Sequence, residues 1–225
     1  MPSDNITLPP IATQDQWDRA LKSLLEKEKA LTRLQDELAA ERRRLPMVPV
    51  DGEYRFTGPE GEISLLELFQ GRRQLIVYCA MLEPGATPCE GCSMVMDNIG
   101  HNLAHVNARD TTFVFTSPAP QDEILALQKR MHWLAPWYTD HGRRFADAFG
   151  AGKGFAINVF IRDDNHQVYR TYFSTNRGGE LFDTHFRLLD ITPYGRQEKW
   201  EDSPEGWPQT APYEWWRMHD DYGRG

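Results

Sequence analysis

A buried strand followed at once by a cysteine pair is the feature that most constrains the fold of this chain. Residues 75–81 (LIVYCAM) are nearly continuous in apolar residues, which is typical of a central strand buried on both faces. A loop then leads to Cys89 and Cys92, just before a segment predicted to be helical. Such a pair can close a small disulfide ring with its first sulfur at the positive end of a helix. The arrangement indicates redox chemistry.

The segments after the cysteines alternate between helix and strand. The predicted elements are helix 93–107, strand 111–116, a helix with Ile124, Leu127 and Met131 on one face, strands 155–161 and 167–174 of a hairpin, and helix 179–189. The helix with Ile124, Leu127 and Met131 is predicted from apolar residues at helical spacing. The hairpin is predicted from the tight reversal between its two strands. The resulting order, βαβαββα, predicts a parallel sheet with right-handed crossovers that an antiparallel hairpin extends.

The N-terminal part predicts one long helix. Residues 16–44 contain neither Gly nor Pro, and Thr13 or Asp15 can cap the helix. Apolar residues recur every seven positions, at Trp17, Leu24, Leu31, Leu38 and Leu45. The companion positions are polar, so we interpret the segment as an amphipathic helix lying on its own domain; a helix that forms a homodimer is the alternative. Residues 51–73 predict a short hairpin and a helical turn.

The chain is expected to divide into an N-terminal arm and long helix (1–49), one α/β domain (50–191) and a C-terminal tail (192–225). The tail combines prolines with tryptophans and tyrosines and has no periodicity. Such a segment cannot build a core of its own, yet it is too aromatic to remain in water. We therefore expect it to wrap over the domain or over a partner subunit.

Charge and composition exclude some classes of protein. The 225 residues carry a formal net charge of -8, which argues against nucleic acid as a partner. We find no signal-peptide pattern and no apolar run of about 18 residues, so neither secretion nor a membrane is expected. The predicted location is the cytoplasm. In that reducing compartment, two cysteines at this spacing are typical of catalysis or metal binding.

The predicted element order, with Cys-x-x-Cys at the start of the first helix, resembles a thioredoxin fold. Residues 64–69 (SLLELF) and 71–77 (GRRQLIV) resemble its peroxiredoxin branch. More closely, the chain resembles a bacterial thioredoxin-like family of uncharacterised function. The matching stretches are 26–33 (EKEKALTR), 38–46 (LAAERRRLP), 74–78 (QLIVY), 91–93 (GCS), 189–196 (LDITPYGR) and 217–222 (RMHDDY). The resemblance implies a thioredoxin-like α/β fold, with a central mixed sheet flanked by helices, and implies no substrate.

The chain departs from its relatives near the cysteines. Relatives commonly carry His after the Tyr of the first strand, where this chain has Cys79. Thioredoxins place a cis-proline before the third strand, but residues 150–155 (GAGKGF) contain no proline. The dipeptide between the cysteines is Glu-Gly, and the negative charge of Glu90 is expected to disfavour a Cys89 thiolate. We therefore predict a slow and weakly oxidising cysteine pair.

The favoured function is thiol-disulfide oxidoreduction of a protein or a small molecule, with no required cofactor. Cys89 would attack from the helix N-cap and Cys92 would resolve the mixed disulfide. Peroxidase activity is a variant of this function. An alternative is a copper or zinc site formed by Cys79, Cys89 and Cys92. Its fourth ligand would come from His101, His105, His141 or His185. A second alternative is a binding protein without catalysis.

Overall fold

A computed structural model describes residues 8–99 and 102–223. Within these residues, eight strands form one mixed sheet in the order β1-β8-β7-β4-β5-β6-β2-β3. Their bounds are β1 (Val48–Pro49), β2 (Arg55–Gly58), β3 (Gly61–Ser64), β4 (Gln74–Cys79), β5 (Thr111–Ser117), β6 (Trp137–Thr139), β7 (Ala156–Arg162) and β8 (Val168–Ser174). β4 lies at the centre, parallel to β5 and antiparallel to β7.

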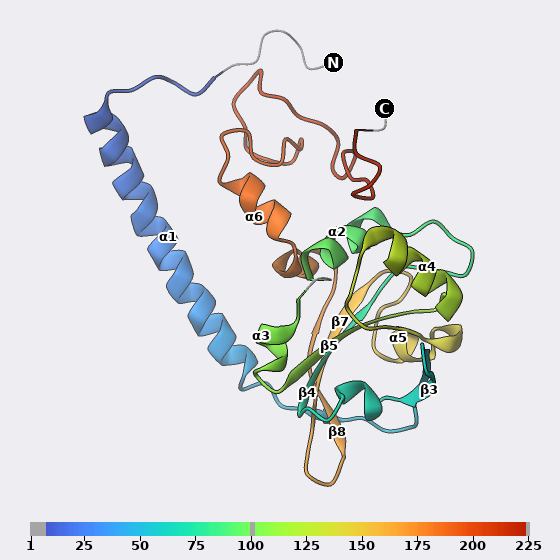
Figure 1. Cartoon of the computed structure of the whole chain (residues 1–225). Helices are drawn as coiled ribbons and strands as arrows, with labels where there is room; N and C mark the ends of the chain where they lie inside the picture. Colours follow the sequence, from blue (N-terminus) through green and yellow to red (C-terminus); the bar gives the residue numbers. More distant parts are fainter. Residues whose placement is uncertain (1–7, 100–101, 224–225) are drawn as a thin grey trace.

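Helices cover both faces of this sheet (Figure 1). The α-helices are α1 (Gln14–Arg42), α2 (Glu90–Ile99), α3 (Ala104–Asn107), α4 (Gln121–Met131), α5 (Arg144–Ala148) and α6 (Thr184–Asp190). Three 3-10 helices complete the description: η1 (Glu67–Phe69), η2 (His141–Arg143) and η3 (Asn176–Phe182). One face of the sheet packs against α2 and α4, and the other packs against η1 and α5.

The core of the sheet confirms the predicted thioredoxin-like fold. β4, α2, β5, α4, β7, β8 and α6 occur in the βαβαββα order, and α3, β6, η2, α5 and η3 are inserted between them. β8-β7-β4-β5 are neighbours in the sheet. Two predicted helices differ from the observed ones. The helix expected over 93–107 begins earlier, at Glu90, and is divided into α2 and α3. The helix expected over 179–189 begins as η3 and restarts at α6, where the Asp183 side chain caps the new helix.

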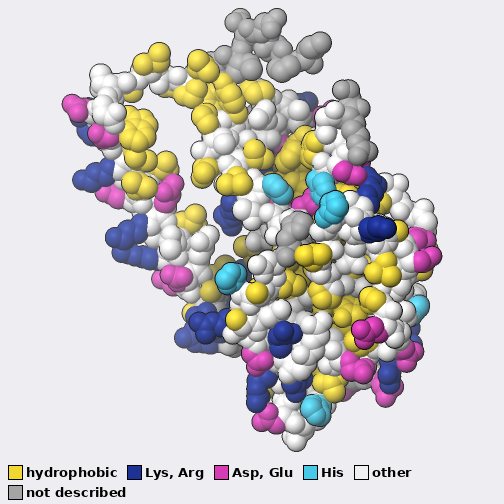
Figure 2. Space-filling model, viewed as in Figure 1, with side chains coloured by type: hydrophobic (Ala, Val, Ile, Leu, Met, Phe, Trp, Pro, Cys, Tyr) yellow, Lys and Arg dark blue, Asp and Glu magenta, His cyan; other side chains and the backbone are white. Residues whose placement is uncertain are grey.

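The long N-terminal helix forms as predicted but does not lie on the domain. Thr13 and Gln16 form a capping box that starts α1 at Gln14. None of the α1 residues is buried, and Leu24 and Leu31 are each 51% exposed. Near its C-terminal end the helix meets β8, where the Arg42 guanidinium lies 5.4 Å from the Tyr172 ring centre. The interpretation of α1 as a helix packed on its own domain is therefore wrong; it projects from the domain with apolar side chains exposed (Figures 1 and 2).

Consecutive residues of β4 enter two different cores. Side chains alternate between the faces of a strand, so Tyr78 packs beneath α2 and α4, whereas Cys79 packs beneath η1 and α5. Both are almost fully buried, at 1% and 2% exposure. Burial of each large apolar side chain contributes about 2 kcal/mol, so β4 is anchored from both sides. This rigid strand fixes the position of the loop that leads to Cys89.

The C-terminal tail wraps over its own domain, which is one of the two arrangements predicted from the sequence. Met218 is 4% exposed and enters the core beneath α2 and α4. Beside it, His219 Nδ1 lies 2.6 Å from Asp97 Oδ1, and Arg130 makes two 2.8 Å hydrogen bonds to Asp220. The tail is therefore attached to α2 and to α4, and it passes over the end of α2 that carries the cysteines (Figure 1).

Candidate functional site

Cys89 occupies the N-cap of α2. Its carbonyl oxygen accepts the first helical hydrogen bond, from the Ser93 backbone N–H at 2.9 Å, and its own N–H donates to the Met81 carbonyl oxygen at 3.4 Å. The side chain is partly exposed. The unpaired N–H groups and the positive end of the dipole at a helix N-terminus stabilise a negative charge there. The local fold therefore favours a thiolate at Cys89.

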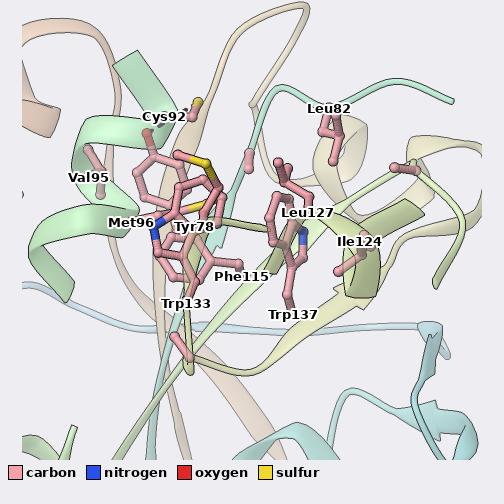
Figure 3. Close-up of a cluster of buried hydrophobic side chains, with 14 of the residues drawn as sticks. Tyr78, Leu82, Cys92, Val95, Met96, Phe115, Ile124, Leu127, Trp133 and Trp137 are labelled. Carbon is pink, nitrogen blue, oxygen red and sulfur yellow. Dashed lines mark hydrogen bonds between the residues drawn. The ribbon is translucent and has the colours of Figure 1, made fainter. Parts of the chain in front are cut away.

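Cys92 lies one helical turn further and is 4% exposed. The Met81 backbone N–H donates to its sulfur at 3.5 Å, and the Tyr78 hydroxyl donates to the same sulfur at 3.6 Å. Figure 3 shows the Tyr78 hydroxyl directed at Cys92 from the strand below. Phe155 stacks on the Tyr78 ring, with ring centres 5.5 Å apart and planes 5° from parallel. The second cysteine is thus held in place by the core.

The two thiols differ strongly in acidity. A hydrogen bond from Cys92 to the Cys89 sulfur is the largest influence; together with the backbone N–H groups of Cys92 and Gly91, it lowers the pKa of Cys89 from 9.0 to about 6. Glu90 raises that pKa, as the sequence predicts, but its effect is smaller than those of the hydrogen bonds. The predicted direction of the Glu90 effect is therefore confirmed, whereas the predicted net suppression of the Cys89 thiolate is wrong.

The proton stays on Cys92. Its hydrogen bond to Cys89 is the largest cause, and burial the next, of a Cys92 pKa well above 9.0. Burial likewise raises the pKa of the Tyr78 phenol well above 10.0, so this group remains a hydrogen-bond donor. The pair therefore combines a partly exposed sulfur of lowered pKa with a buried sulfur of raised pKa, which is the division of roles that thiol-disulfide exchange requires.

We expect the alkylation rate of Cys89 to rise with pH to a plateau with a midpoint near pH 6. The thiolate is the reactive form, and with a pKa of about 6 most Cys89 thiols are already ionised at pH 7. Iodoacetamide labelling between pH 4 and pH 10, read by peptide mass spectrometry, measures this midpoint. A Glu90→Gln variant should shift it slightly downward, because Glu90 opposes the thiolate. A midpoint at pH 8 or above would contradict the hydrogen bonds described here.

The third cysteine does not join the other two. Cys79 packs on the opposite face of β4 from Cys92, and burial raises its pKa to about 12. Among the described residues, no group of three or more His, Cys, Asp or Glu side chains is placed to hold a metal ion. The structure thus separates the three sulfurs that the copper or zinc hypothesis requires to converge.

The histidines proposed as a fourth ligand are scattered. His101 lies outside the described residues, and His105 and His141 are exposed, with His141 2.7 Å from the Thr57 hydroxyl. His185 is exposed as well, and its Nδ1 lies 2.9 Å from the Asn98 side-chain nitrogen. These positions give the metal hypothesis no further support.

A cavity of about 460 Å³ adjoins the cysteine pair. Cys89 and Cys92 contribute to its wall, together with Tyr78 from β4 and with Tyr213 and Trp216 from the tail. Sequence reasoning missed the last three residues. Alternation along β4 could have identified Tyr78, because it must face away from Cys79. No local pattern in the sequence marks Tyr213 or Trp216.

The strand order and the cysteine pair at the start of α2 place the chain in the thioredoxin-like class of α/β proteins. Residues 6–222 match the model of a family described as "Bacterial protein of unknown function (DUF899)". The chain belongs to this family, which confirms the resemblance stated from the sequence. A search of curated proteins finds no match.

Several solved structures are similar to parts of the chain. Peroxidoxin BcpB from Mycobacterium tuberculosis is 18% identical, with a TM-score of 0.42 over 55% of this chain and 82% of that one. A putative thiol:disulfide interchange protein DsbE from Chlorobium tepidum is 12% identical, with a TM-score of 0.43 over 64% and 97%. Thioredoxin peroxidase I from Plasmodium yoelii is 15% identical, with a TM-score of 0.43 over 77% and 97%. At these values the similarities bear on neither activity nor substrate.

In the described part of the chain, no helix is both long enough and apolar enough to cross a membrane.

Proposed function

We propose that this protein is a thiol-disulfide oxidoreductase in which Cys89 attacks and Cys92 resolves. The observation that carries the proposal is the position of a partly exposed Cys89 at the N-cap of α2, one helical turn from the buried Cys92. The lowered pKa of Cys89, about 6, and the raised pKa of Cys92 agree with this arrangement. A lowered pKa at one sulfur, beside a second thiol, is the arrangement that activates a cysteine for exchange.

The reaction has two exchange steps. The Cys89 thiolate attacks one sulfur of a disulfide, forms a mixed disulfide, and releases the other sulfur as a thiolate that takes a proton from water. Cys92 then loses its proton, attacks the Cys89 sulfur and releases the second thiol. The substrate gains two electrons, and the protein ends with a Cys89–Cys92 disulfide. An external dithiol returns this disulfide to two thiols.

Tyr78 supports the second step. The hydrogen bond from its hydroxyl lowers the pKa of Cys92 against the larger influences that raise it. A negative charge that develops on the Cys92 sulfur is therefore met by two donors, the Tyr78 hydroxyl and the Met81 N–H. Such pre-placed donors stabilise a charge that appears during a reaction.

The test is whether the reduced protein forms the expected disulfide and turns over. We expect one equivalent of a small disulfide to produce a Cys89–Cys92 bond, seen in a peptide map, with Cys79 still alkylatable after unfolding. With dithiothreitol as the electron donor, the protein should then reduce excess disulfide catalytically. Oxidation that leaves Cys89 and Cys92 unlinked, or the absence of turnover, would refute the proposal and favour a binding protein.

A further inference from the structure

The cavity beside the cysteine pair is lined mainly by apolar side chains. Its apolar wall consists of Tyr78, Met81, Val95, Phe155, Phe186, Tyr213 and Trp216. With about 460 Å³ of space, it falls within the range of pockets that bind small organic molecules. Because both cysteines reach this space, a molecule bound there lies beside the sulfur that attacks.

The C-terminal tail forms one side of this cavity and packs tightly against the cysteine loop. A Cβ atom on Gly91 would lie 2.5 Å from Trp216 Cζ3, so the indole ring rests directly on the backbone between the two cysteines. Tyr213 packs against the same indole, with ring centres 4.4 Å apart. Glycine at position 91 is thus required by this close approach.

The tail is also anchored on both sides of this contact. Met218 is buried in the core, and Asp220 pairs with Arg130 through two 2.8 Å hydrogen bonds. On the other side, the buried Glu198 carboxylate accepts from the Tyr213 backbone N–H at 2.9 Å. A folded protein approaching Cys89 across Gly91 would have to displace this anchored segment. On the Gly91 side the tail therefore hinders a folded protein, whereas the cavity remains open to a molecule that fits it.

The charged side chains in the wall are already paired with one another or with neighbours. Arg177 Nε donates to Glu180 at 2.9 Å. Asp183 accepts from the Asn98 side chain and from the His185 backbone N–H. The wall thus carries two carboxylates and one guanidinium beside the Cys89 sulfur, and the guanidinium is already bonded to Glu180. It offers mainly apolar contact, and its excess of negative charge disfavours an anionic substrate.

We infer that the substrate of this site is a small, uncharged organic disulfide, with one apolar substituent held in the cavity between Tyr78 and Trp216. This inference rests on the function proposed above and names its substrate class. The Cys89 thiolate attacks the substrate sulfur attached to the bound substituent and breaks the S–S bond, and the other half leaves as a thiol after taking a proton. Cys92 then releases the bound half as a second thiol.

The test compares three disulfides with dithiothreitol as reductant: neutral 4,4′-dithiodipyridine, the dianion of 5,5′-dithiobis(2-nitrobenzoate), and insulin. Each rate is divided by the rate of the same disulfide with a free thiol. We expect saturation with the neutral compound and a normalised kcat/KM at least about tenfold above the other two, the scale of a buried aromatic contact. Equal normalised values for all three would overturn the substrate class and leave the proposed function intact. The absence of any turnover above a Cys89→Ser variant would refute the function itself.

Two tail tryptophans supply a matched pair of variants. Trp216→Ala should abolish most of the preference and speed insulin reduction, whereas Trp207→Ala should do neither, because Trp207 does not line this cavity. An unchanged preference in Trp216→Ala would overturn the inference. As a second measurement on the unaltered protein, diphenyl sulfide, which has no S–S bond, should protect Cys89 from iodoacetamide. A lack of protection at its solubility limit would count against the inference, whatever the turnover shows.

Discussion

Replacement of Cys89 by serine is expected to reduce disulfide turnover to the uncatalysed background. A serine hydroxyl is not ionised near neutral pH and does not exchange with disulfides, whereas the Cys89 thiol has a pKa of about 6. Loss of an activated nucleophile lowers turnover on the order of 10³-fold or more. Steady-state reduction of 4,4′-dithiodipyridine measures the effect. Undiminished turnover in this variant would assign the nucleophile to another group.

The resolving cysteine should give a different result. In Cys92→Ser, attack by Cys89 continues, so a mixed disulfide between Cys89 and half of the substrate should accumulate and be visible by intact mass. In Cys92→Ala, the hydrogen bond that most lowers the pKa of Cys89 is also lost. The alkylation midpoint of Cys89 should therefore move upward from about pH 6 in Cys92→Ala, and by less in Cys92→Ser, which retains a donor.

Cys79 provides the control for both variants. It is 2% exposed and packs beneath η1 and α5, so Cys79→Ala should retain turnover and the alkylation midpoint of Cys89. A small loss of stability is expected from the shortened buried side chain. If turnover instead fell as far as in Cys89→Ser, a third sulfur would have to take part in the reaction.

The parts of the site that sequence reasoning predicted are those with local causes. An apolar run set the position of β4, and the residue types after it placed Cys89 at the start of a helix, as the N-cap geometry bears out. The same local reasoning could have separated Cys79 from the pair, because it follows Tyr78 directly along a strand. The sign predicted for Glu90 is right and its predicted weight is wrong, because the hydrogen bond from the Cys92 side chain lowers the Cys89 pKa more than Glu90 raises it.

Long-range packing explains what the sequence could not provide. The tail has no periodic pattern, and His219 contacts Asp97 across 122 residues of sequence. β6 has only three residues and is defined by its pairing with β5 and β2. α1 is the opposite case, a local pattern without the expected packing. Its amphipathic sequence predicts a face packed on the domain, but the described residues of the chain leave that face exposed.

Replacement of Glu198 by alanine is expected to release the tail from the cysteine site. The Glu198 carboxylate is 2% exposed and accepts three hydrogen bonds, from the indole N–H groups of Trp200 and Trp215 and from the Tyr213 backbone. Hydrogen bonds to a charged group contribute about 1.5–3 kcal/mol each. The free energy needed to open the tail should therefore fall by roughly 3 kcal/mol or more.

Hydrogen exchange measures this opening residue by residue. The backbone N–H groups of Thr210 and Lys199 are bonded within the tail, at 2.7 Å and 3.0 Å from their acceptors, and they should exchange on the order of 10²-fold faster in Glu198→Ala. Amides of β4 and β5 should stay protected, because their pairing does not involve the tail. Glu205→Ala removes an exposed carboxylate from the same tail and should leave all of these rates unchanged.

The Glu198→Ala variant also tests whether the tail affects the reaction at Cys89. Glu198 touches neither cysteine, so any change at Cys89 must arise through the segment that it holds, which carries Tyr213 and Trp216. With that segment released, the cavity loses one wall. The preference for a neutral small disulfide should then fall while the alkylation midpoint of Cys89 stays near pH 6, since its hydrogen bonds come from α2. Tail release without loss of preference would contradict the role given to Trp216, and a shifted midpoint would show that the tail also acts on the thiolate.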